Sequence, residues 1–181
     1  MRRFLMISTL LLATPATAAL KPGATAPAFE SQAALAGKAY AYSMKSALKK
    51  GPVVLYFFPA SFTPGCTLEA HEFADTIDDF KKSGATVVGS AGDDIETLAK
   101  FSVAECRNKF PVAVATADII KAFDVAIPMA GRTDRISYVI APTGKIIFAL
   151  TDDDYRSHVV GTLKAVRDWK ATQSKQKRKK A

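Results

Sequence analysis

Short, wholly apolar runs alternate along this chain with longer segments in which apolar residues recur every three or four positions. Residues 53–58 are continuously apolar and lie between two prolines, which is typical of a strand buried on both faces of a sheet. In residues 67–82 the apolar side chains recur at helical spacing until Gly84, which predicts an amphipathic helix. The first expected unit is therefore a central buried strand followed by a helix.

The same order repeats through the rest of the chain. Residues 86–89 predict a second strand, and the acidic pair Asp93-Asp94 begins a helix that is expected to reach about Asn108. Later elements are expected at residues 112–115 (strand), 118–123 (helix), 136–141 with 145–150 (a β-hairpin) and 153–172 (a closing helix). Residues 20–29 are expected to be an extended entry segment. Alternating strands and helices of this kind predict an α/β sandwich.

The first 19 residues carry a different pattern. Arg2 and Arg3 precede a run at residues 4–13 that is apolar apart from Ser8 and Thr9, and small residues follow at Ala16 and Ala18. The run is too short to span a bilayer, so residues 1–19 are predicted to be a secretory signal peptide cleaved near Ala18, with an uncleaved anchor as the alternative. We therefore expect a periplasmic or secreted protein with no membrane span after cleavage, in a compartment that permits disulfides.

Positive charge is concentrated at the two ends of the chain. The formal net charge of the 181 residues is +8, and two arginines at the start and five basic residues after position 174 supply seven of these charges. The body between them is nearly neutral, which argues against a specific nucleic-acid partner. Residues 20–171 are expected to form one domain. Residues 172–181 are expected to be a disordered basic tail, because only the last of them is apolar.

The candidate chemistry lies between the central strand and the helix that follows it. Cys66 is expected in the first helical turn, where unpaired backbone N–H groups and the positive end of the helix dipole stabilise a thiolate. The thiolate is the nucleophilic form of cysteine. Thr63 can turn its hydroxyl toward the same pocket to accept and donate hydrogen bonds, while Pro59 and Pro64 stiffen the loop. This segment therefore predicts a nucleophilic cysteine.

The spacing Pro-x-x-x-Thr-x-x-Cys at Pro59, Thr63 and Cys66 resembles the active-site signature of the peroxiredoxins. The longer string Phe62-Thr-Pro-Gly-Cys-Thr-x-Glu69 is similar to the bacterioferritin-comigratory, or PrxQ, branch of that family. Further along, the strand that begins near Arg135 resembles the one in which the family carries its active-site arginine, so the match assigns that role to Arg135. The match also gives Glu69 a supporting role in the hydrogen-bond network around the cysteine.

The resemblance implies an α/β protein with a thioredoxin-like fold of the peroxiredoxin type, a central mixed β-sheet flanked by helices. It implies peroxidase activity without a metal or organic cofactor. The substrate would be hydrogen peroxide or an organic hydroperoxide, and the reductant a thiol protein such as a thioredoxin-like or glutaredoxin-like one. The family branch also implies a monomer.

The sequence leaves open how the Cys66 sulfenic acid is resolved. One PrxQ subgroup carries a resolving cysteine five residues after the first, where this chain has His71, and another resolves from the following helix, in which Cys106 is expected. Cys106 is the preferred resolving residue, although its disulfide with Cys66 requires local unwinding. A packing role for Cys106, with direct reduction by an external thiol, is the alternative. His71 and Cys66 alone are too few ligands to predict a metal site.

Two other classes of function fit the same fold. Thiol–disulfide exchange of the thioredoxin type normally needs a Cys-x-x-Cys pair, and Thr63 stands where the partner cysteine would lie, so this class is disfavoured. The alternative to an enzyme is a non-catalytic thioredoxin-fold binding module. It would use a Cys66–Cys106 disulfide only as a staple and would act through the basic tail.

Overall fold

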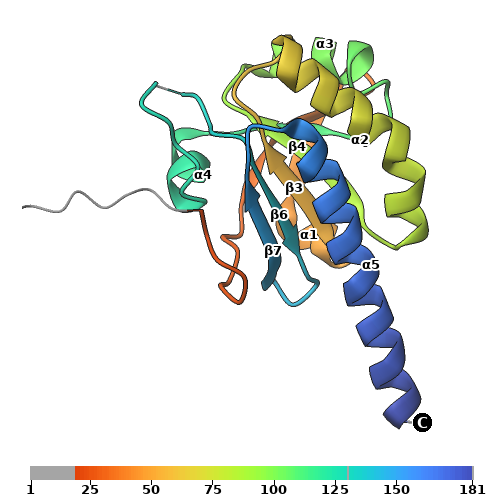
Figure 1. Cartoon of the computed structure of the whole chain (residues 1–181). Helices are drawn as coiled ribbons and strands as arrows, with labels where there is room; N and C mark the ends of the chain where they lie inside the picture. Colours follow the sequence, from red (N-terminus) through yellow and green to blue (C-terminus); the bar gives the residue numbers. More distant parts are fainter. Residues whose placement is uncertain (1–18, 130, 181) are drawn as a thin grey trace, which may run out of the picture.

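The computed structural model describes residues 19–129 and 131–180, so the predicted signal peptide lies, except for Ala19, outside the described residues. A seven-stranded mixed sheet forms the middle layer (Figure 1), with the strand order β2-β1-β5-β4-β3-β6-β7. The strands are β1 (Glu30–Leu35), β2 (Lys38–Ser43), β3 (Val53–Phe57), β4 (Thr86–Ala91), β5 (Val112–Val114), β6 (Ile136–Ile140) and β7 (Ile146–Thr151). The mixed sheet flanked by helices confirms the predicted architecture.

Strand β3 is an interior strand, as its continuous apolar run predicts. It pairs in parallel with β4 and antiparallel with β6, and all five of its residues are buried. Its alternate side chains enter two separate cores, because successive residues of a strand point to opposite faces. Val54 and Tyr56 belong to one core, and Val53, Leu55 and Phe57 to the other.

Helices cover both faces of the sheet. The core that contains Tyr56 is closed by α2 (Pro64–Lys82), α3 (Ile95–Ala104) and α5 (Tyr155–Lys180), and the opposite core by α1 (Met44–Leu48) and α4 (Ala117–Ala122). Helices α2 and α5 pack against each other on the same face, as Figure 1 shows. Because α2 begins directly after the loop that leaves β3, the start of this helix lies above the carboxyl end of an interior strand.

The entry segment, expected to be extended, makes a turn at residues 21–24 and contains no helix, and it is attached to the β7 edge of the sheet. Ala19 and Leu20 pack against the core closed by α1 and α4, and the Leu20 N–H donates to the Tyr138 hydroxyl at 3.1 Å. The Gly23 N–H donates to the Ile146 carbonyl at 2.8 Å. Among the described residues, no helix is long and apolar enough to cross a membrane.

Residues 172–180 differ from the prediction of a disordered tail. Helix α5 continues without a break to Lys180, and in Figure 1 its last turns project away from the body of the domain. Two physical reasons account for the difference. Lys, Arg and Gln are good helix formers, and the helix is already nucleated by its packed first half, so each added residue only propagates it. The positive charge of residues 172–180 is therefore not enough to end the helix.

The predicted helix from Asp93-Asp94 to Asn108 begins where expected and ends early. Asp94 caps α3 by accepting a hydrogen bond from the Thr97 N–H at 2.7 Å. The helix stops at Ala104, and the backbone φ angles of Arg107 and Asn108 are positive, at 50° and 59°. Left-handed residues cannot continue a right-handed helix. Cys106 therefore lies in a turn after α3 and not within the helix.

Candidate active site

The start of α2 holds Cys66 in the third position of the helix. Thr63 is the N-cap, with extended backbone angles, and Pro64 occupies the first helical position, where its missing N–H costs no hydrogen bond. The first backbone bond of the helix runs from the Thr67 N–H to the Thr63 carbonyl at 2.9 Å. Cys66 is thus within the turn whose backbone N–H groups are unpaired, as the sequence predicts, and only 2% of its surface is exposed.

Arg135 is the side chain that meets the Cys66 sulfur. It lies immediately before β6, and its Nη2 is 3.6 Å from Cys66 Sγ. A side chain at Gly65 would begin 3.2 Å from the same Nη2 atom, so the glycine leaves the room that this contact needs. Two residues 69 positions apart in sequence are thereby brought together, and a permanent positive charge faces a thiol that can ionise.

Glu69 fixes the other side of the Arg135 guanidinium. Arg135 Nη1 donates to Glu69 Oε2, and the Glu69 side chain is fully buried one turn after Cys66. Burial raises the pKa of Glu69 to about 8, although the Arg135 charge opposes the shift. Its second oxygen, Oε1, has no hydrogen-bond partner among the described residues. Glu69 therefore sits in the network around Cys66, where the resemblance expected it.

The loop before α2 is fastened by an ion pair that sequence reasoning missed. Asp93 accepts a hydrogen bond from the Ser61 N–H at 2.7 Å and one from Arg132 Nη1 at 2.8 Å. The same Arg132 nitrogen donates to the Pro59 carbonyl at 3.2 Å. Pro59 therefore contributes its carbonyl to the fastening of the loop, in addition to a stiff backbone. Asp93 and Arg132 are 39 positions apart, and no local pattern marks them as partners.

Thr63 is exposed, three residues before the buried Cys66. Its hydroxyl donates to the Ala60 carbonyl at 3.0 Å, so its proton is already engaged within the loop. The lone pairs of the oxygen stay available to accept a hydrogen bond. Phe62 beside it is 47% exposed, has a φ of 61°, and its ring packs edge-on against Phe101. Phe62 and Thr63 are thus exposed on the loop, whereas Cys66 at the third helical position is buried.

Cys106 is buried in the same hydrophobic core as Cys66, and both thiols are free. Burial raises the pKa of the Cys106 thiol, because the thiolate is poorly solvated there. His71, at the position where a resolving cysteine stands in one PrxQ subgroup, contacts Glu105 instead, with 2.7 Å between Nε2 and Oε2. Tyr56, which no motif singled out, belongs to this core too, and its buried hydroxyl has no partner among the described residues.

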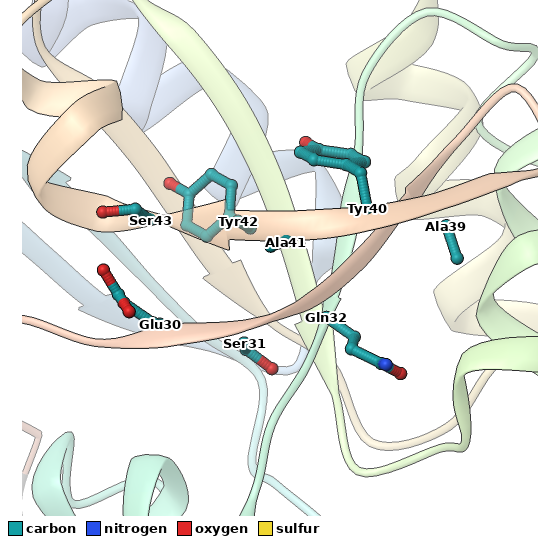
Figure 2. A pocket seen from close by; sticks show the side chains of 8 residues that line it. All are labelled: Glu30, Ser31, Gln32, Ala39, Tyr40, Ala41, Tyr42 and Ser43. Atoms are coloured by element: carbon teal, nitrogen blue, oxygen red, sulfur yellow. The ribbon is translucent and has the colours of Figure 1, made fainter.

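Four surface hollows have no cysteine among their lining residues. The one drawn in Figure 2 has a volume of about 470 Å³ and is lined by residues of β1 and β2, among them Tyr40, Tyr42 and Gln32. It contains no thiol, no imidazole and no arginine. A hydroperoxide needs little room, so we locate the site by the Cys66–Arg135–Glu69 contacts and not by cavity size. The described residues form no group of three or more side chains suited to hold a metal ion.

Comparison with known proteins gives a consistent result. The model of the AhpC/TSA family matches residues 22–149. The chain is 33% identical over 124 residues to a chloroplastic peroxiredoxin Q of Oryza sativa subsp. japonica, which covers 66% of this chain and 56% of that protein. It is 33% identical over 130 residues to a chloroplastic peroxiredoxin Q of Sedum lineare, covering 69% and 68%. The chain thus spans little more than half of the rice relative.

Solved structures share the fold. The peroxidoxin BcpB of Mycobacterium tuberculosis superposes with a TM-score of 0.76 and 28% identity, covering 82% of this chain and 97% of that one. Peroxiredoxin Q of Xanthomonas campestris gives a TM-score of 0.67 with 25% identity, covering 77% and 90%. Both agree with the expectation of a thioredoxin-like fold of the peroxiredoxin type.

Proposed function

Because the chain belongs to the AhpC/TSA family and is similar to peroxiredoxins of the PrxQ and bacterioferritin-comigratory type, we propose that it is a thiol-dependent peroxidase whose nucleophile is Cys66. One observation carries the proposal for this chain. The Arg135 guanidinium lies 3.6 Å from the Cys66 sulfur at the start of a helix, and it is held there by the buried Glu69 side chain. A charge so placed favours the thiolate and the transition state in which negative charge leaves the sulfur.

In the first step the Cys66 thiolate attacks one oxygen of the peroxide. The O–O bond breaks, the sulfur becomes a sulfenic acid, and the departing oxygen takes a proton to leave as water or an alcohol. Arg135 stabilises the departing oxygen by donating hydrogen bonds. Thr63 accepts a hydrogen bond from the peroxide, a role narrower than the sequence suggests, since its own proton is engaged by the Ala60 carbonyl.

In the second step Cys106 attacks the sulfenic sulfur, which forms a Cys66–Cys106 disulfide and releases water. The shared hydrophobic core of the two thiols supports Cys106 over an external thiol. Its burial means that the segment that carries it must open first, because a buried, protonated thiol is a poor nucleophile. An external dithiol, as in thioredoxin-like or glutaredoxin-like proteins, then returns both cysteines to thiols.

The cellular setting is part of the same proposal. The pattern of residues 1–18 supports export to the periplasm or beyond, where the mature chain acts as a monomer. Sequencing the N-terminus of the protein recovered from the periplasm tests the cleavage near Ala18. Recovery of the intact chain in the membrane fraction would contradict it.

The decisive experiment follows the two sulfurs after one equivalent of peroxide. We expect mass spectrometry of the wild type to find a 66–106 disulfide, Cys106→Ser to stop at a Cys66 sulfenic acid that a dimedone-type reagent traps, and Cys66→Ser to consume no peroxide. A sulfenic acid that persists in the wild type would favour direct reduction by an external thiol. Absence of any Cys66 oxidation would leave the non-catalytic binding module as the remaining function.

A further inference from the structure

Three side-chain contacts fasten the turn that carries Cys106 to one face of α2. His71 Nε2 contacts Glu105 Oε2 at 2.7 Å, and Asp75 accepts a hydrogen bond from Arg107 at 2.5 Å. Between them, Lys109 Nζ donates to the Ala74 carbonyl at 3.0 Å. The α2 positions involved, 71, 74 and 75, are neighbours on one helical face. We call these three contacts the α2 clamp.

The backbone of the same turn combines hydrogen bonds with two strained residues. The Cys106 N–H bonds back to the Phe101 carbonyl at 3.1 Å, the Asn108 N–H to the Ser102 carbonyl at 3.0 Å, and the Lys109 N–H to the Cys106 carbonyl at 2.9 Å. Against these bonds stand Arg107 and Asn108, two consecutive residues in the left-handed region. Residues other than glycine adopt that region only at a cost in free energy. The clamp therefore supplies interactions that the turn itself lacks.

Opening of this turn is the step on which the proposed resolution depends. Cys106 is 0% exposed, whereas Glu105 is half-buried and residues 107–109 are exposed. The thiol therefore reaches solvent, or a sulfenic acid at Cys66, only when the segment leaves α2. The polar side chains on either side of it are held by two ion pairs whose side chains are 18% to 61% exposed and by the Lys109 hydrogen bond, and such contacts open at modest cost.

We propose that the α2 clamp sets how a Cys66 sulfenic acid divides between disulfide formation with Cys106 and over-oxidation by a second peroxide. This inference rests on the proposed function. In the first branch the Cys106 sulfur bonds to the Cys66 sulfur and water leaves. In the second branch a further peroxide molecule transfers one oxygen to the Cys66 sulfur, which gives a sulfinic acid and water or an alcohol. His71, Asp75, Glu105 and Arg107 are positioning residues in this scheme, since they act through Cys106.

The structure offers a matched pair of variants for the test. Asp75→Ala removes the Arg107 partner, whereas Asp78→Ala removes a somewhat more exposed carboxylate of α2 that faces Lys81 at 3.8 Å. We expect Asp75→Ala to form the 66–106 disulfide about two- to five-fold faster than the wild type and to lower the sulfinic fraction at high peroxide, because an ion pair of this kind changes an opening equilibrium by that factor. The sulfenic acid should form at an unchanged rate in both variants.

Two further measurements separate this role from a general loosening of the fold. The exchanged pair Asp75→Arg with Arg107→Asp should restore the wild-type partition, and amide hydrogen exchange should accelerate at Cys106 and Asn108 in Asp75→Ala but not in Asp78→Ala. His71→Ala should act in the same direction as Asp75→Ala and more strongly, because the His71–Glu105 pair is the less exposed of the two.

The outcomes distinguish failure of the inference from failure of the proposed function. Equal disulfide rates in wild type, Asp75→Ala and Asp78→Ala would overturn the inference while leaving Cys106 as the resolving residue. No 66–106 disulfide in any of these proteins would overturn both the resolution step and the inference. Faster formation of the 66–106 disulfide in Asp75→Ala than in the wild type supports both the resolution by Cys106 and the inference.

Discussion

The two cysteines share one core but are held by opposite means. Around Cys66 the fastening is buried: the Arg135–Glu69 pair lies inside the protein, and the loop before α2 is tied to Asp93, whose side chain is 14% exposed. Around Cys106 the fastening lies nearer the surface: the Arg107–Asp75 pair has side chains 42% and 61% exposed, and the His71–Glu105 pair 31% and 18%. A hydrogen-bonded contact inside the protein is costly to break, and an exposed ion pair is not.

The difference fits the separate tasks of the two cysteines in the proposed catalytic cycle. The peroxide reacts at a sulfur whose surroundings must stay fixed, because the donors have to meet the departing oxygen in place. The second sulfur has to travel, so rigid fastening would slow it. A fold can supply both when the nucleophile begins a long packed helix and the second thiol follows the end of a short one.

The largest effect is expected from Arg135, whose charge lies beside the Cys66 sulfur. Arg135→Lys removes the planar guanidinium that contacts both Cys66 and Glu69. The rate of sulfenic acid formation should then fall about 100-fold or more, because losing one hydrogen-bond donor to the transition state has an effect of this size. Stopped-flow measurement of single-turnover peroxide reduction checks this value. Arg167→Lys, which alters an exposed pair with Asp79, is the matched control and should leave the rate unchanged.

A change in the pH dependence of stability is expected from Glu69. Its pKa in the folded protein is about 8 against an ordinary 4.5, so between these values the folded state holds a proton that the unfolded chain has released. The stabilisation is complete below about pH 4.5 and is lost as the pH rises toward 8. Relative to Glu69→Gln, the wild type should lose up to about 1.4 kcal/mol of unfolding free energy per pH unit in this window. Urea denaturation of both proteins from pH 5 to 8 measures the slopes, and parallel curves would contradict the assignment.

Asp93 tests whether fixing the loop matters for chemistry as well as for folding. Asp93→Ala leaves the Ser61 N–H and Arg132 without their shared acceptor, so we expect a loss of about 1–3 kcal/mol in stability and about 10-fold in the rate of sulfenic acid formation. Asp94→Ala removes the N-cap of α3 and should lower stability less than Asp93→Ala does. Its rate should stay that of the wild type, and an equal loss in the two variants would mean that the loop effect is only instability.

The sequence predicted the elements whose residues are buried on a regular period. Strand β3 and helix α2 follow from apolar spacing, and the place of Cys66 follows from them. The β1–β2 hairpin was missed, because β2 has a single fully buried position and the two-residue turn is Ala36-Gly37. Both turn residues have positive φ, at 50° and 77°, but alanine gives no signal for such a turn, as asparagine or aspartate would.

The candidate site also has a part that the sequence predicted and a part that it did not. Cys66, Thr63 and Pro59 lie on one continuous segment, so their proximity follows from the chain itself, and Arg135 was placed by resemblance to a family strand. The contacts of Asp93 with Arg132, and of α2 with the turn after α3, join residues more than 30 positions apart. Side-chain partners at such separations depend on the tertiary packing, which no local pattern in one sequence records.

The end of α5 offers the smallest expected effect and a control for the whole comparison. Residues 173–180 extend beyond the last contacts of the helix with α2, in which Arg167 pairs with Asp79 and Lys170 donates to the Lys82 carbonyl. A chain that ends at Thr172 keeps both contacts, so its unfolding free energy should change by less than about 0.5 kcal/mol, the range for exposed positions. Its peroxide reduction and its disulfide rate should equal those of the full chain. A slower reaction in the truncated protein would mean that this charged helix end acts on one of the two cysteines, and the contrast between them could then not be assigned to their local fastening alone.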